Sequence, residues 1–390
     1  MKERFRGIGE YAPIPVRIKE AREYSRFTTT ELANKIDKTR QAVSQFENGT
    51  TKPAPEILQR IADATGFPLK YFFKKPKYSA GTMSQIPLYR GSPSKTESLK
   101  RSYEIATNWS SEVVDFLKNY VVLLDVNLPD GIEFDPFSKV DTLMRIEAVA
   151  NKVRRHWHLG KSPIYDLVGT LENNGFIISK IPNKSKEVEA FSLWSGGIPY
   201  IFYEGNRNTS TSYIFSICHE LGHLILHAGM QKEELLNKSL YNEIEQQAHL
   251  FAGAFLMPAE TFGNEYLTSN LNSFIQIKKK WSVSISAMIM RASALGIIDD
   301  QKKSYLYRQL SSRGYRKREP YDDEIIFQEP SIIYNSIQLL LDNKVITLQD
   351  LMNDIAIPTD ALAAICSISE EYINNHLGLT RKVPHLQVIK

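Results

Sequence analysis

Two histidines and a glutamate stand close together near the middle of this 390-residue chain, in the run His219-Glu-Leu-Gly-His-Leu-Ile-Leu-His227. Residues four apart share one face of a helix, so His219 and His223 can bind one metal ion with Glu220 beside its water. Zinc lowers the pKa of such a water to near neutrality, and a carboxylate can then use it to attack a carbonyl group. The spacing therefore predicts a metal-dependent peptidase site, with Glu220 as the general base.

A catalytic zinc site needs a third protein ligand. His227 lies about 12 Å along the helix axis from His219, which is too far to share one ion, so we expect it to support a ligand or to pack. Glu245, on a second predicted helix, is the better candidate, and Glu243 is the fallback. His249 lies on the same helix face as Glu245 and could be a ligand, a transition-state donor or a partner of a ligand.

The elements around this motif are predicted to be mainly helical, with a small amount of strand. Two glycines, Gly196 and Gly197, lie between alternating apolar runs and predict a hairpin. Met257-Pro258 ends the second metal-site helix. The expected helices are 140–157, 166–174, 242–256 and those within 271–314 and 330–377. The expected strands are 175–181, 191–194 and 198–203. Residues 98–125 have no clear pattern until they end in a strand-like run at 120–124.

The N-terminal segment carries the positive charge of the chain. Residues 1–78 contain 16 Lys/Arg and 9 Asp/Glu, a net charge of +7, whereas the whole chain carries only +4. A small basic domain ahead of a mildly acidic one is typical of nucleic-acid binding, although a solvated charged surface gives the same balance.

Short helices are predicted throughout this basic segment. Thr30 is the expected N-cap of helix 31–36, and Thr39 is the expected N-cap of helix 40–47. Asp37-Lys38 forms the tight turn between them, and Gly49 ends the second helix. Further helices are expected at 14–24, 55–65 and 67–73, followed by a linker rich in Pro, Ser, Gly and Lys.

Composition excludes several classes of protein. The sequence holds no run of about 18 apolar residues, so no membrane span is predicted. The N-terminal residues lack the apolar segment of a secretory signal, and Cys218 and Cys366 are the only cysteines. These features favour a reducing cytoplasm over a disulfide framework and exclude a thiolate-rich metal site.

The metal motif together with the run Glu245-Gln-Gln-Ala-His-Leu-Phe-Ala-Gly-Ala-Phe-Leu-Met-Pro258 resembles the ImmA/IrrE family of metallopeptidases. The resemblance covers roughly residues 140–320, and it implies His219, His223 and Glu245 as ligands and Glu220 as base. It also implies regulated cleavage of a repressor-type protein. This chain has His249 where the family usually has Asn, and Tyr213 near the position of a usual Arg. Further matching runs are residues 163–167, 171–175, 190–192, 280–284, 291–296 and 314–320.

Residues 30–49 resemble the helix-turn-helix of the XRE/Cro/C1 repressor family. Small and apolar side chains at 32, 33, 36, 43 and 46 can hold two short helices at a sharp angle, and Asp37 tolerates left-handed geometry better than most residues. The second helix is expected to enter the major groove of double-stranded DNA, and a homodimer is expected because such modules read paired half-sites. The expected base-contacting residues are Arg40, Gln41, Ser44 and Gln45, and the expected phosphate contacts are Lys38, Thr39 and Lys52.

The expected fold is therefore mainly α with an α+β part. We predict a helix-turn-helix domain at 1–78, a linker at 79–97, a zincin-like peptidase domain at 98–270 and a helical extension at 271–390. The expected cofactor is Zn²⁺, with Mn²⁺ or another divalent ion as the alternative. The hypothesis is a cytoplasmic DNA-binding regulator that cleaves a repressor or another partner protein. Two alternatives stay open, namely a repressor whose metal domain senses or assembles without proteolysis, and a component of a toxin–antitoxin or phage-defence pair.

Overall fold

The structure of the chain is a computed structural model. It describes residues 12–77, 88–89, 97–182, 189–205, 209–230, 234, 237–265 and 270–376. Most of the predicted linker 79–97 and the N-terminal residues used above to judge secretion lie outside these ranges. No helix in the described ranges is both long and apolar enough to cross a membrane.

The N-terminal helices begin and end at strong local signals. Thr39 caps α3 by accepting a hydrogen bond from the backbone N–H of Ala42, and Gly66 ends α4 in left-handed geometry. The predicted N-cap of the preceding helix is wrong: Thr28, not Thr30, caps α2, because Thr28 and Glu31 form a reciprocal capping box. These helices are α1 (Pro15–Tyr24), α2 (Thr29–Lys35), α3 (Arg40–Glu47) and α4 (Pro55–Thr65), followed by a 3₁₀ helix (Leu69–Phe73).

The turn between α2 and α3 uses left-handed backbone, as expected for a helix-turn-helix. Asp37 has φ +56°, which an Asp tolerates at lower cost than most side chains. Leu32, Ala33 and Val43 are fully buried beneath the turn and fix the two helices against each other. The apolar positions predicted from the sequence therefore form the core of this motif.

A long helix, α5 (Glu97–Leu117), follows the N-terminal helices and packs against α1. The strand predicted at 120–124 is wrong, since these residues form a turn and then irregular backbone. Val122 is fully exposed and Tyr120 about half exposed, so this apolar run is not a strand of the sheet. Its composition favours strand, but strand formation needs a hydrogen-bonding neighbour.

A buried ionic network joins the N-terminal helices to α5. The Arg17 guanidinium lies 3.0 Å from Glu20 and 3.2 Å from Glu112, and all three side chains are buried. Lys74 lies 2.7 Å from the second oxygen of Glu112, and the Tyr71 hydroxyl donates to Glu20. Because Arg17 and Lys74 of the N-terminal part both bind Glu112 on α5, buried ion pairs hold the N-terminal helices against α5.

The sheet has the order β1-β3-β4-β2. Strand β3 (Ala190–Ser195) pairs antiparallel with β4 (Ile198–Tyr203), and the predicted hairpin is confirmed, with Gly196 and Gly197 at positive φ. On the other side of β4, β2 (Ile177–Lys180) pairs in parallel. The two-residue strand β1 (Leu88–Tyr89) pairs with β3 at the opposite edge.

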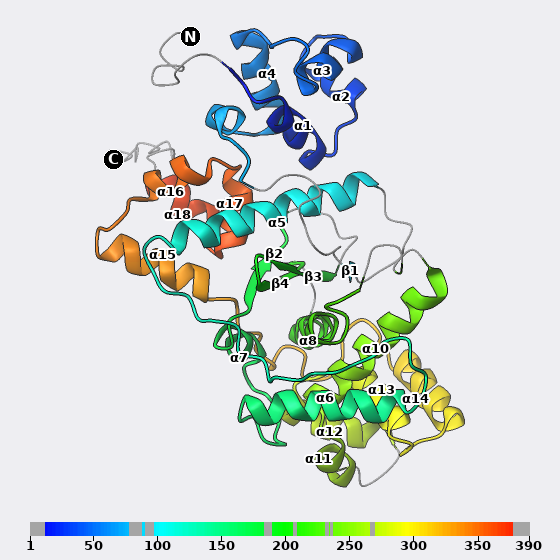
Figure 1. Ribbon diagram of the computed structural model, residues 1–390. Coiled ribbons are helices and arrows are strands. Elements are labelled where there is room, and N and C mark those ends of the chain that lie inside the picture. The colour runs from blue at the N-terminus through cyan, green and yellow to red at the C-terminus, as the bar shows by residue number, and fades with distance from the viewer. Residues whose placement is uncertain are drawn as a thin grey trace, which may run out of the picture.

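Helices cover both faces of this sheet (Figure 1). One face packs on α5, and the other packs on α8 (Ser210–Leu226), which carries the metal motif. The next long helix, α10 (Lys238–Leu256), lies beside α8 and is flanked by α6 (Thr142–His156). The remaining elements of this part are α7 (Leu167–Glu172), α11 (Ala259–Glu265), α12 (Leu271–Trp281), α13 (Ile285–Ala294) and α14 (Asp300–Ser312).

Two apolar cores result. The first core lies between one face of the sheet, α5, the N-terminal helices and the four C-terminal helices. The second core lies between the other face of the sheet and the helices α6, α8 and α10 to α14. The mainly α fold class with an α+β peptidase part is confirmed. The C-terminal helices are α15 (Ile332–Asp342), α16 (Leu348–Ile355), α17 (Thr359–Cys366) and α18 (Glu370–His376).

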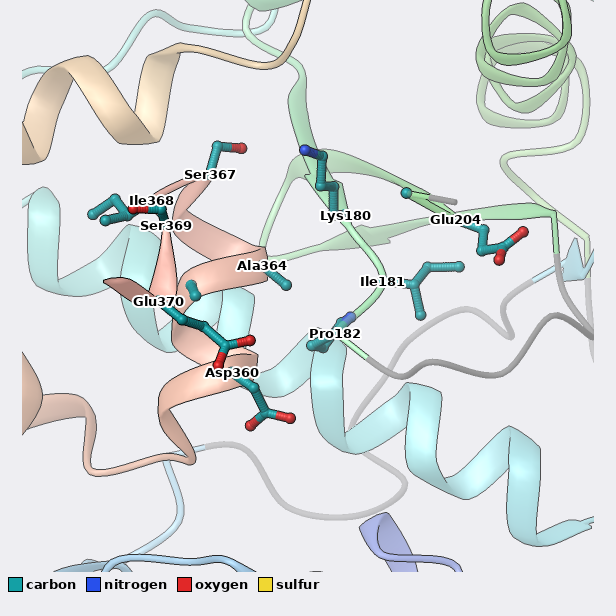
Figure 2. Close-up of a pocket in the computed structure, with 12 residues that line it drawn as sticks. Lys180, Ile181, Pro182, Glu204, Asp360, Ala364, Ser367, Ile368, Ser369 and Glu370 are labelled. Carbon is teal, nitrogen blue, oxygen red and sulfur yellow. The ribbon is translucent and has the colours of Figure 1, made fainter. Parts of the chain in front are cut away.

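A hollow of about 470 Å³ separates the edge of the sheet from the C-terminal helices. Figure 2 shows Lys180 and Ile181 on the sheet side, and Asp360 and Glu370 on the helical side. Lys180 is held by an ion pair of 2.9 Å with Glu329. The hollow contains none of the site residues predicted from the sequence.

Candidate metal centre and DNA-reading face

A glycine lets the two helices of the candidate metal centre approach closely. Gly222 lies between the motif histidines in sequence, and a Cβ atom there would stand 3.2 Å from the backbone of Ala248 on α10 and 3.1 Å from the Phe251 ring. A glycine inside a helix costs about 1 kcal/mol relative to alanine. Here it allows the α8–α10 contact that brings Glu245 to the histidines.

The structure places His219, His223 and Glu245 in one cluster, with ligand atoms within 4.8 Å of one another. The two Nε2 atoms lie 3.0 Å apart, and each lies 3.4 Å from a different oxygen of Glu245. Both imidazoles are buried, and Glu245 is partly exposed. The cluster therefore opens toward solvent on the side of α10.

These separations fit a divalent metal ion. Ligands that bind zinc tetrahedrally at about 2.0–2.1 Å are about 3.3 Å from one another. The two imidazole nitrogens lie 3.0 Å apart, each lies 3.4 Å from one oxygen of Glu245, and all the ligand atoms lie within 4.8 Å of one another, so the cluster has the size that one ion needs. Two imidazole nitrogens with one carboxylate also form a donor set that catalytic zinc uses, which leaves one position open.

The cluster keeps Glu245 ionised. Burial alone would raise the pKa of this carboxyl, but the neighbouring imidazoles of His219 and His223 hold the pKa well below its usual value. Tyr241, one turn earlier on α10, also forms a side-chain hydrogen bond with Glu245. Burial and the nearby carboxylate raise the pKa of Tyr241, so its hydroxyl remains protonated and can donate. Tyr241 was not among the residues predicted from the sequence, although its i, i+4 spacing to Glu245 was a usable signal.

Glu220 is fully buried beside the histidines. The Ser192 hydroxyl on β3 donates a hydrogen bond of 2.8 Å to one of its carboxylate oxygens. Ser192 shares a strand face with Trp194, whose indole N–H donates to the backbone of α8, so alternation along β3 aims both residues at this helix. The sheet thus fixes the orientation of the candidate base.

A chain of hydrogen bonds sets the tautomer of His223. The Gln247 amide donates from Nε2 to the Pro136 carbonyl, which leaves its oxygen facing Nε2 of His227 at 2.9 Å. His227 must therefore carry its proton on Nε2 and accept on Nδ1 from Nδ1 of His223, 3.0 Å away. Burial lowers the pKa of His227 to about 3, which keeps this ring neutral. His223 is then left with a lone pair on the Nε2 that faces Glu245, as metal binding requires.

The other candidates lie around the cluster. His249 is half-buried, with its ring 5.3 Å from that of His219 and 5.0 Å from that of Phe215. Glu243, the fallback ligand, lies outside the cluster and pairs instead with Lys139 at 3.4 Å. Cys218 is buried against α10, and burial raises the pKa of its thiol, so it packs as an inert small residue.

The DNA-reading candidates lie on α3 and in the segments just before and after it, and α3 packs on α1, which in turn packs on α5 (Figure 1). Val43 and Phe46 form the buried side of this helix. Apart from the capping hydrogen bond of Thr39, the candidate side chains make few contacts within the protein. The exposed ones are Lys38, Thr39, Arg40, Gln41 and Lys52, and the half-exposed ones are Ser44 and Gln45.

Fold and site together define a helix-turn-helix protein with a metallopeptidase-type domain. Residues 172–293 match the family model described as the IrrE N-terminal-like domain, Peptidase_M78, and residues 18–72 match the helix-turn-helix model HTH_3. The predicted combination of an ImmA/IrrE-type domain with an N-terminal XRE-type helix-turn-helix is confirmed. No curated protein sequence matches the chain significantly.

Proposed function

We propose that this chain is a DNA-binding transcriptional regulator that hydrolyses a peptide bond of a repressor or another partner protein at the centre on α8 and α10. The observation that carries the proposal is the close cluster of His219, His223 and Glu245, whose ligand atoms lie within 4.8 Å of one another, next to the buried carboxylate of Glu220. We assign these three residues as the ligands of a divalent ion, with zinc as the best fit to the donor set.

The residues of the chain divide the chemistry among them. A bound divalent ion supplies Lewis-acid polarisation of the scissile carbonyl and lowers the pKa of a water molecule. Glu220, oriented by Ser192, takes a proton from the attacking water and later passes it to the leaving amine. His227 and Gln247 hold His223 in the binding tautomer.

The N-terminal helices bring this activity to DNA. Arg40 and Gln41, at the start of α3, present the donors and acceptors that suit guanine and adenine in the major groove. Lys38 and Lys52 are placed to contact phosphates, which position the domain without reading sequence. We propose a homodimer on DNA, since modules of this type read paired half-sites.

Metal analysis combined with proteolysis tests the proposed function. The purified chain should contain about one zinc per protomer, cleave a candidate repressor, lose cleavage in a chelator and regain it when zinc is restored. If the Glu220→Gln variant regulates transcription in cells as well as the wild type does, proteolysis is not the function. That outcome would favour the alternative of a metal domain that senses or assembles without cutting.

A further inference from the structure

Two hollows meet beside the candidate metal centre. The first, of about 480 Å³, runs from Glu245 on α10 to α13 and to Lys303 on α14. The second, of about 260 Å³, continues toward Arg316 and Lys317. They form one groove, referred to below as the α10–α13 groove, because both are lined by the same four residues, Phe215, His249, Ala287 and Met290.

The middle of the groove is apolar and accessible. The Met290 side chain is 39% exposed, a large fraction for an apolar residue on a helix that otherwise packs into the second core. Phe215 and Ala287 lie next to it in the lining. A methionine beside an aromatic ring forms an adaptable surface that accepts apolar side chains of several shapes.

Two acidic residues of the lining, Glu319 and Asp322, share one buried cation, and Glu245 at the other end belongs to the metal cluster. Glu319 and Asp322 bind the fully buried Lys278 ammonium at 2.8 and 2.5 Å, and Glu319 also accepts hydrogen bonds from the first N–H groups of α13. Within the lining, Arg291 is engaged as well, in an ion pair with Glu147.

Three other cations in the lining have no acidic partner within the described ranges of the chain. They are Lys303, Arg316 and Lys317. Arg316 donates a hydrogen bond to the neutral hydroxyl of Ser311, and both Arg316 and Lys317 are exposed. The groove therefore has an apolar middle and a net positive rim, which complements an acidic occupant.

We propose that the α10–α13 groove binds a protein segment in which an apolar side chain is flanked by Asp or Glu, and that it selects such segments for the metal centre. The groove begins at Glu245, so a segment lying in it continues directly into the cluster. The inference rests on the proposed function, since it names the class of peptide that the same site takes. Met290 receives the apolar side chain, and Arg316 and Lys317 pair with the acidic ones.

Peptide binding by the zinc-loaded Glu220→Gln chain tests this proposal without requiring cleavage. The first probe is a fluorescent octapeptide of leucines flanked by aspartates and glutamates, and the second has lysines at the acidic positions. The acidic peptide should bind about tenfold more tightly at low salt, with a preference that falls as ionic strength rises. The double variant Arg316→Glu/Lys317→Glu should reverse the preference.

The control is Arg308→Glu, an exposed cation on α14 that lies outside the groove lining and should leave the preference unchanged. Equal binding of the two peptides, no binding of either, or reversal by the control variant would overturn the proposal. If the acidic peptide binds as expected but the wild-type chain cleaves no peptide, the result supports peptide binding by the groove and contradicts the proposed hydrolysis.

Discussion

The candidate metal centre and the candidate DNA-reading face place their side chains in opposite surroundings. His219, Glu220 and His223 are at most 2% exposed, whereas Arg40 and Gln41 are exposed on α3. Burying polar groups is costly unless they find partners, so Glu220 accepts a hydrogen bond from Ser192 on β3 and His223 donates one to His227 at the end of α8. The exposed side chains of the reading face need no such partners and require only a helix that presents them to DNA.

Mutations in the two regions should therefore act in different ways. A change in the metal centre disturbs partners on α8, α10 and β3, while a change on the reading face alters the DNA contact alone. A third region, the buried network around Arg17, joins α1 to α5. Substitutions in the three regions should therefore have separable effects.

The largest effect is expected from removing the carboxylate ligand. Glu245→Ala should weaken zinc binding by more than the roughly 10–100-fold typical of an outer partner, because the ion loses one of three protein ligands. Competition with a chelator measures this. Glu243→Ala, two residues earlier on the same helix, is the matched control and should bind zinc as the wild type does. DNA affinity should be unaffected by either variant.

Breaking the buried network should lower the stability of the whole chain. Arg17→Met leaves Glu20 buried without its cation and weakens the compensation of Glu112, a loss of about 3 kcal/mol by analogy with other broken buried pairs. Chemical denaturation of the full chain measures it. Lys19→Met, on the exposed side of the same helix, should change stability by less than about 0.5 kcal/mol. Equal effects of the two substitutions would contradict the anchoring of the N-terminal helices on α5.

Disrupting the relay behind His223 should weaken zinc binding by about 10–100-fold without removing a ligand. Gln247→Leu leaves His227 without its acceptor, so the tautomer of His223 is no longer fixed. The neighbouring Gln246→Leu alters a residue that lines the groove instead and serves as the control. Unchanged zinc affinity in Gln247→Leu would show that the relay has no role in metal binding.

The smallest effect is expected at the reading face. Arg40→Ala should weaken binding about tenfold to the DNA duplex that the wild-type chain selects from a random pool, with relaxed preference at one base position. Lys52→Ala should weaken binding to all sequences alike and lower its salt dependence. Zinc content should remain as in the wild type. Lys70→Ala, an exposed lysine outside the predicted contacts, is the control.

Local signals allowed the helix-turn-helix to be predicted in detail. The bounds of α3 and α4 agree with the sequence, because Thr39 and Pro55 are strong start signals. At α2, three consecutive threonines could each serve as the cap, and only the reciprocal bond with Glu31 selects Thr28. Propensity alone could not show that the apolar run at 120–124 lacks a strand to pair with.

The sequence predicted the residues that α8 and α10 contribute to the candidate metal centre, but not the contacts that other elements make with them. The i, i+4 spacing of His219 and His223 follows from helix geometry, which the sequence displays, and Glu245 was selected from its place on a second predicted helix. Ser192 and Pro136 reach the site through the sheet and through a loop far away in sequence. Their contacts depend on tertiary packing, and periodicity within one element carries no information about it.

Cleavage of a peptide library by the zinc-loaded chain, compared with its Glu220→Gln variant, tests the central claim most directly. The account predicts new peptide termini with the wild type and cleavage about a thousandfold slower with Glu220→Gln, while both proteins bind zinc and DNA equally. Cleavage at the same rate by both proteins would contradict the role of Glu220. An absence of cleavage by a wild-type chain that binds both zinc and DNA would contradict the proposed hydrolysis itself.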